Sequence, residues 1–138
     1  MSDAEAYAFL AEGQRTGKVA TVRADGRPHL VPIWFVVDGT DLLFMTGADT
    51  VKGKSLARDP RVALTADLEE PPYAFVTVEG TVTLSDDTEA MLPHSIDIGV
   101  RYMGAERGEE FGRRNAAPGE LLVRLTPNKI IGVGDLTG

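Results

Sequence analysis

The sequence contains no cysteine, which excludes disulfides, thiolate nucleophiles, iron–sulfur clusters and cysteine-bound zinc. It also lacks a run of about 18 apolar residues, the length that a membrane-spanning helix needs. Positive charge is scarce as well, since 14 Lys and Arg stand against 21 Asp and Glu and give a formal net charge of −7. Nucleic-acid binding requires a basic face that neutralises phosphates, so this charge balance argues against that class of protein.

The composition that remains is typical of a globular domain. The chain has 138 residues, of which 43% are hydrophobic and 25% charged, and this is enough for a core without disulfides or a structural metal. We therefore expect a single domain over residues 1–138. The acidic start, Met1 to Glu5, lacks the basic-then-apolar order of a signal peptide, which predicts a cytoplasmic protein without a membrane partner.

Short strands dominate the pattern after a helix predicted over residues 3–15, capped by Ser2 or Asp3. The turn signal Asp25-Gly26 predicts a hairpin between a strand at 19–22 and a return strand at 29–37. Pro32 cannot donate to a strand ladder, so the return strand should be an edge or carry a bulge there. Further strands are expected at 41–46, 61–67, 73–84, 121–126 and 129–133.

Two helices are predicted between these strands. One covers residues 50–58, with Asp49 or Thr50 as its cap, and the other covers residues 86–104. Gly80 predicts a bulge in the strand before the second helix, and the polar residues 106–119 are expected to be a mobile segment. About seven antiparallel strands with few helices predict a mainly β fold, a β-barrel with flanking helices.

The stretch from Leu30 to Val37 is apolar on both faces of its predicted strand. One face of an antiparallel barrel normally meets water. The pattern therefore predicts that another subunit, a cofactor or both cover the outer face, and a homodimer is the simplest arrangement.

Residues 43–60 hold the sequence's candidate binding site. A strand ends, a polar turn follows, and a helix begins with Lys52 and Lys54 in its first turns. Amide groups at a helix N-terminus are unpaired and attract anions, and nearby hydroxyls add donors. These hydroxyls belong to Thr46, Thr50 and Ser55. The pattern predicts a phosphate site, although a solvated helix face explains the same residues equally well.

The order of these segments resembles the pyridoxamine 5′-phosphate oxidase superfamily, whose fold is an antiparallel split β-barrel. The likeness covers about residues 5–134 and includes the hairpin from Gly17 to Pro32 and the later stretch from Val78 to Val82. Its most specific parts are a strand end, a Thr-x-Lys segment and a helix end, which here are Phe44-Met45-Thr46, Thr50-Val51-Lys52 and Leu56-Ala57-Arg58-Asp59-Pro60.

The resemblance also implies a cofactor site between the two subunits of a homodimer. Lys52 would contact the cofactor phosphate, helped by Thr50, Lys54 and Ser55. The residues expected along an isoalloxazine-type ring are Pro32, Ile33, Trp34, Met45 and Thr46. No side chain is assigned a catalytic role, no metal site is expected, and the substrate is a small molecule.

One departure bears on the choice of cofactor. FMN-using oxidases of the superfamily usually carry Arg before the lysine, whereas this chain has Val51. The chain also lacks the long C-terminal substrate segment, rich in Arg and His, of true pyridoxamine phosphate oxidases. The run from Lys52 to Leu56 looks closer to short members that bind the deazaflavin coenzyme F420. The resemblance thus implies F420-dependent hydride transfer to a small organic acceptor. The alternatives are an FMN-dependent oxidoreductase and a non-catalytic flavin, deazaflavin or haem binder.

Four residues also have a simpler structural interpretation. His29 is expected to be a surface residue of its strand, and packing explains Trp34 better than stacking on a ring. Arg101 and Tyr102 fit an exposed helix face better than a substrate-binding role.

Overall fold

Seven strands and four helices make up the protein in a computed structural model that describes residues 1–138. The strands are β1 (Gly17–Val22), β2 (Pro28–Ile33), β3 (Phe35–Asp38), β4 (Asp41–Gly47), β5 (Arg61–Asp67), β6 (Phe75–Ser85) and β7 (Glu120–Val133). The helices are α1 (Asp3–Ala11), α2 (Val51–Arg58), α3 (Thr88–Met103) and α4 (Ala105–Asn115).

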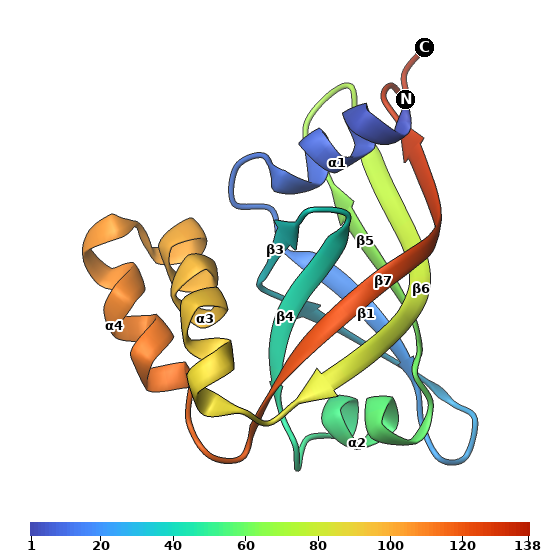
Figure 1. Ribbon diagram of the computed structural model, residues 1–138. Helices are drawn as coiled ribbons and strands as arrows, with labels where there is room; N and C mark the ends of the chain where they lie inside the picture. Colours follow the sequence, from blue (N-terminus) through green and yellow to red (C-terminus); the bar gives the residue numbers. More distant parts are fainter.

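The strands form one antiparallel sheet in the order β2-β1-β5-β6-β7-β4-β3. Its two edge strands, β2 and β3, are consecutive in the chain and are joined by the single residue Trp34. The sheet must therefore curl until its edges meet at one corner, as Figure 1 shows. This architecture is a split β-barrel, as the resemblance implied.

The core fills the inside of the curled sheet. Alternate residues of β1 and β6 point inward, and the strands are buried at every second position, as a sheet with one packed face requires. Phe35 lies opposite Phe44 across the β3–β4 ladder, and both side chains are fully buried. Burying each ring contributes about 1.5–3 kcal/mol. Helix α1 adds Ala6 and Leu10 to the same cluster.

Helices α1 and α2 lie across opposite ends of the barrel (Figure 1). Ser2 and Glu5 form a capping box at the start of α1. Thr50 caps α2 by accepting a hydrogen bond from the Gly53 N–H at 3.0 Å. Both caps agree with the sequence analysis, although α1 ends at Ala11 and is shorter than the helix predicted over 3–15.

Helices α3 and α4 pack against each other as a hairpin beside the sheet (Figure 1). Glycine is required where they touch, because a Cβ on Gly108 would lie 2.4 Å from the Val100 Cα and one on Gly112 would lie 2.5 Å from the Ile96 Cα. The sequence analysis predicted no helix within residues 106–119, whereas residues 106–115 of that segment are helical. The two glycines weaken the helix locally, but here close packing against α3 outweighs their low helix propensity.

Two strand predictions are also wrong. The return strand expected over 29–37 is interrupted at Trp34, where the chain passes from β2 to β3. The strands expected at 121–126 and 129–133 are instead one continuous strand, β7, because Gly80 has no side chain and leaves room for the Thr126 carbonyl. The ladder shifts register at Gly80, which confirms the predicted bulge.

Other predictions from the sequence are confirmed. Asp25 and Gly26 turn the chain between β1 and β2, and Pro32 lies on an edge strand, as its missing N–H predicts. No helix is long and apolar enough to cross a membrane.

Candidate functional site

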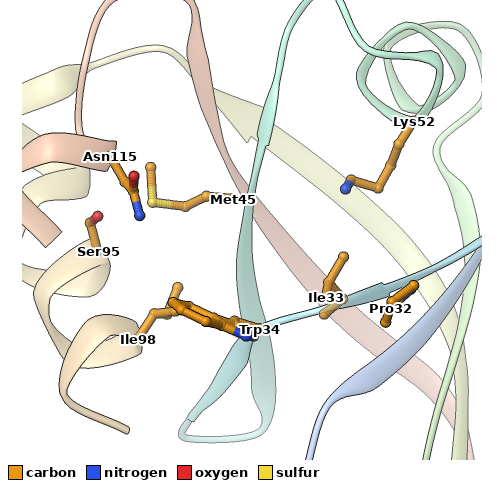
Figure 2. A pocket seen from close by; sticks show the side chains of 8 residues that line it. All are labelled: Pro32, Ile33, Trp34, Met45, Lys52, Ser95, Ile98 and Asn115. Atoms are coloured by element: carbon orange, nitrogen blue, oxygen red, sulfur yellow. The ribbon is translucent and has the colours of Figure 1, made fainter. Parts of the chain in front are cut away.

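A cavity of about 250 Å³ opens where the end of β2, strand β4 and helices α2, α3 and α4 come together (Figure 2). Its lining combines apolar side chains with the cationic Lys52 and the polar side chains of Ser95 and Asn115. Its walls are formed by Pro32, Ile33, Trp34, Met45, Lys52, Ser95, Ile98 and Asn115.

Lys52 supplies the positive charge of this lining. It follows the Thr50 cap, in the first turn of α2, and its amino group points toward Ile33 in Figure 2. Burial lowers the pKa of the Lys52 ammonium from its usual 10.5, while the nearby Glu120 carboxylate opposes the shift. No carboxylate lies within ion-pair distance of Lys52. The cavity therefore offers a half-buried positive charge that an anion can neutralise.

A second hollow of about 320 Å³ adjoins the cavity, and Met45, Lys52 and Asn115 line both. Here the hydroxyl oxygens of Thr46 and Thr50 lie 3.1 Å apart. The Thr50 hydroxyl also donates to the Gly47 carbonyl at 2.8 Å. The two threonines thus fix the turn that carries the start of α2 toward the cavity.

The two openings bring together seven of the nine residues that the resemblance implies. These are Pro32, Ile33, Trp34, Met45, Thr46, Thr50 and Lys52. Lys54 and Ser55 line neither opening. Lys54 is exposed to solvent, whereas Ser55 is buried and only 2% exposed. Because the helix has 3.6 residues per turn, Lys54 points away from Lys52. Ser55 lies on nearly the same side of the helix as Lys52, but its side chain is buried and lines neither opening.

The sequence analysis missed three cavity residues, Ser95, Ile98 and Asn115, which come from the α3–α4 hairpin. The buried Ser95 hydroxyl donates to the Gly112 carbonyl at 2.8 Å and so joins the two helices next to the cavity. A serine on the otherwise apolar side of α3 was the available signal, but the partner helix had not been predicted.

Gly53 was also missed. A Cβ at this position would lie 2.2 Å from the Gly47 carbonyl oxygen. The glycine therefore allows the first turn of α2 to approach the end of β4, which holds Lys52 beside Met45. A glycine inside the first helical turn was the signal in the sequence.

Arg101 and Tyr102 do not lie on an exposed helix face, and that interpretation is wrong. The Arg101 guanidinium donates to the carbonyls of Leu10, Gly13 and Phe35 at 2.7, 2.9 and 2.7 Å. The Tyr102 ring stacks on Trp34 with centroids 5.1 Å apart and planes 6° apart. The backbone carbonyls that these two side chains bond lie outside α3, so the helix pattern alone could not reveal them.

His29 is half-buried on β2 and lines neither opening. Trp34 packs against aromatic neighbours, as predicted, and also lines the cavity.

The profile of the pyridoxamine 5′-phosphate oxidase family matches residues 3–134, nearly the whole chain. The chain therefore belongs to this family, whose fold binds flavin-type cofactors. The match agrees with the split β-barrel and with the extent of the resemblance found in the sequence.

Solved structures with the same fold carry several different descriptions. A conserved hypothetical protein from Mycobacterium tuberculosis is 26% identical, with a TM-score of 0.83 over 96% of this chain and 84% of its own. A protein described as an F420 reductase is 24% identical, with a TM-score of 0.73 over 91% of this chain and 95% of its own. A haem storage protein from Vibrio cholerae is 20% identical, with a TM-score of 0.71 over 88% of each chain.

Proposed function

We propose that the protein is an oxidoreductase that uses the deazaflavin coenzyme F420 to transfer hydride to a small organic acceptor. The observation that carries this proposal is the cavity itself, in which an unpaired, half-buried lysine faces apolar and aromatic walls. A ligand with a ring system and an attached phosphate matches this site, with the ring against the apolar walls and the phosphate at the lysine. The F420 reductase among the similar structures supports the same assignment.

The charge of the cavity favours F420 over FMN. Lys52 is the only cation among the residues that line either opening. The phosphate of F420 is a diester and carries one negative charge. The phosphate of FMN is a monoester and carries about 1.5 to 2 negative charges at neutral pH. Val51, which stands where FMN-using relatives carry Arg, removes a guanidinium fork that would hold a dianion in two hydrogen bonds.

The residues of the chain would bind and orient the cofactor, which supplies the hydride when bound. Lys52 would hold the phosphate, with the free N–H groups at the start of α2 beside it. Ile33, Trp34 and Met45 would contact the ring and exclude water from one side. Apart from Lys52 and Glu120 no ionisable side chain lines either opening, and we assign no side chain as proton donor.

The test is a fluorescence titration of the purified protein with F420 and, in parallel, with FMN. Saturable F420 binding that exceeds FMN binding supports the proposal. Lys52→Ala should weaken binding by about 1.5–3 kcal/mol, the usual value of a hydrogen bond to a charged group, which is roughly 10- to 150-fold in Kd. Lys54→Ala is the matched control, because it removes the same charge from an exposed position on the same helix.

Two alternatives are kept as outcomes of the same titration. Tighter binding of FMN would favour a flavin-dependent oxidoreductase, which the family match also supports. Binding without turnover, including binding of haem, would favour a non-catalytic carrier. The haem storage protein among the similar structures is the reason to include haem in the titration.

We also propose that two copies form a homodimer through the outer face of β2, with the cofactor at the interface. Leu30 is 66% exposed on this face and stands two residues from Pro32, which lines the cavity. A hollow of about 570 Å³ beside Leu30 is bordered by the apolar side chains Tyr73, Phe75 and Leu136. Light scattering should find a dimer, and Leu30→Glu should shift it toward monomer; a monomeric wild-type protein would contradict this arrangement.

A further inference from the structure

Trp34 occupies an unusual place in the fold, because it joins the two edge strands without pairing in either ladder. β2 ends at Ile33 and β3 begins at Phe35, and neither register includes Trp34. The strand ladders therefore do not fix how this side chain points. Its orientation depends on the side chains around it.

Tyr102 of α3 is the main contact of the Trp34 ring. The two rings are stacked, with centroids 5.1 Å apart and an angle of 6° between their planes. Phe111 of α4 meets the same indole more obliquely, with centroids 6.4 Å apart and planes at 61°. Such aromatic pairs contribute energy beyond the area that they bury. Tyr102 covers one face of the indole, and Tyr102 is not among the residues that line the cavity.

The Tyr102 ring is itself held in place by its hydroxyl group. The hydroxyl donates to the Arg15 carbonyl at 2.8 Å and accepts the Phe35 N–H at 3.2 Å. Burial raises the pKa of Tyr102, so the hydroxyl keeps its proton at neutral pH. The ring that supports Trp34 is thus tied to the residue that follows Trp34 in the chain.

Arg101 also contacts Phe35, the residue that follows Trp34. Its guanidinium donates to the Phe35 carbonyl at 2.7 Å and lies over the Phe35 ring, 4.6 Å from the centroid. It also donates to the Leu10 carbonyl at 2.7 Å, at the end of α1. Both backbone polar groups of Phe35 are therefore bonded by consecutive residues of α3, which locks the β2–β3 corner against that helix.

The rest of the indole lines the cavity. Figure 2 shows the Trp34 ring nearly edge-on beside Ile98, with Met45 and Asn115 on the other side of the open space. A flat aromatic surface fixed from behind is suited to a flat ligand, because stacking then costs no reorganisation of the wall.

We propose that Tyr102 is a positioning residue that stacks on Trp34 and presents the indole to the cavity as a fixed wall for a planar fused-ring ligand. The identity of that ligand rests on the proposed function, whereas the stacked pair exists without it. Arg101 supports the pair by holding Phe35. The site thus depends on a side chain that contacts no ligand.

Trp34 is the only tryptophan of the chain, so intrinsic fluorescence reports on it alone among indoles. In the cofactor-free protein, Tyr102→Leu should make Trp34 more accessible to acrylamide and shift its emission to longer wavelength. Tyr102→Phe keeps the ring but loses the hydrogen bonds of its hydroxyl to Arg15 and Phe35, so its quenching should lie between those of wild type and Tyr102→Leu. Tyr7→Leu is the matched control, since Tyr7 is also a half-buried tyrosine whose hydroxyl donates to a backbone carbonyl, that of Thr40, but it lines neither opening. Unchanged quenching in Tyr102→Leu would overturn the inference.

Binding gives the second readout. Tyr102→Leu should weaken the binding of whichever of F420 and FMN the wild type prefers by roughly three- to tenfold, the range that one aromatic contact supports. Trp34→Leu should weaken it as well, and the double variant should bind no more weakly than Trp34→Leu alone, because Tyr102 acts through Trp34. If the losses of binding free energy in the two single variants add up in the double variant, Tyr102 does not act through Trp34. If Tyr102→Leu does not fold, Tyr102→Met, which fills the space without a ring, takes its place in every comparison.

The outcomes separate the two proposals. Equal binding by wild type and Tyr102→Leu would refute the positioning role and leave the proposed function standing. A wild-type protein that binds no flavin-type ring would refute the proposed function and the ligand role of Tyr102 together.

Discussion

Replacing Gly112 by alanine should destabilise the α3–α4 hairpin that carries Asn115 to the cavity. The added Cβ would lie 2.5 Å from the Ile96 Cα and 2.6 Å from its backbone nitrogen, closer than real Cβ contacts come. Because both atoms belong to the backbone, no side chain can move aside and the two helices must separate. The separation also stretches the hydrogen bond from the Ser95 hydroxyl to the Gly112 carbonyl.

The size of the effect follows from three contributions. Overpacking of this kind costs about 1–3 kcal/mol. Loss of the Ser95 hydrogen bond costs about 1 kcal/mol, and the better helix propensity of alanine returns about 1 kcal/mol. The net loss is about 1–3 kcal/mol, which lowers Tm by about 4 °C for each kcal/mol in a domain of this size.

Thermal unfolding followed by circular dichroism and by Trp34 emission measures this loss, since Trp34 contacts Phe111 of α4. Gly108→Ala should act in the same direction, because its Cβ would lie 2.4 Å from the Val100 Cα. Glu110→Ala, at an exposed position of the same helix, should stay within about 0.5 kcal/mol of wild type. A Gly112→Ala protein as stable as wild type would refute the close packing of the two helices.

Two further predictions concern charged side chains. Burial lowers the pKa of Lys52 below 10.5, and only the protonated amine attracts phosphate, so cofactor affinity should fall as pH rises through that pKa. Binding titrations between pH 7 and 10.5 should find this fall in wild type. Lys52→Arg should not show it, because the arginine keeps its charge. Arg101→Met should lower the free energy of unfolding by about 2–4 kcal/mol, since several hydrogen bonds from a charged donor are lost. Urea unfolding measures the second effect, and a loss below 0.5 kcal/mol, the range of ordinary surface changes, would contradict it.

Local patterns predicted the features of the fold that local physics controls. The Asp25-Gly26 turn, the Thr50 cap and the Gly80 bulge all follow from backbone preferences of a few residues, and all occur in the structure. The edge position of Pro32 follows from its missing donor. The family resemblance added the cavity residues from Pro32 to Trp34, which no periodicity would have singled out.

Features that depend on contacts between distant elements were not predictable from the sequence. Helix α4 contains two glycines that weaken it in isolation, and only the fit against α3 explains them. Continuous β7 depends on the absence of a side chain at Gly80 of the neighbouring strand. Arg101 binds carbonyls of α1 and β3 that lie far from it in the chain, so its helix position alone carried no sign of this role.

The different positions of the two lysines of α2 were also not predictable from the sequence. Lys52 and Lys54 are equivalent in composition, yet only Lys52 lines the cavity, because the helix turns the other lysine toward solvent. Gly53 between them allows the close approach to Gly47 that sets this orientation.

The measurement that tests the central claim most directly is the parallel titration of wild type, Lys52→Ala and Lys54→Ala with F420 and FMN. The account predicts that wild type binds F420 more tightly than FMN, that Lys52→Ala loses most of this affinity and that Lys54→Ala retains it. Tighter binding of FMN, or equal losses in the two lysine variants, would contradict it.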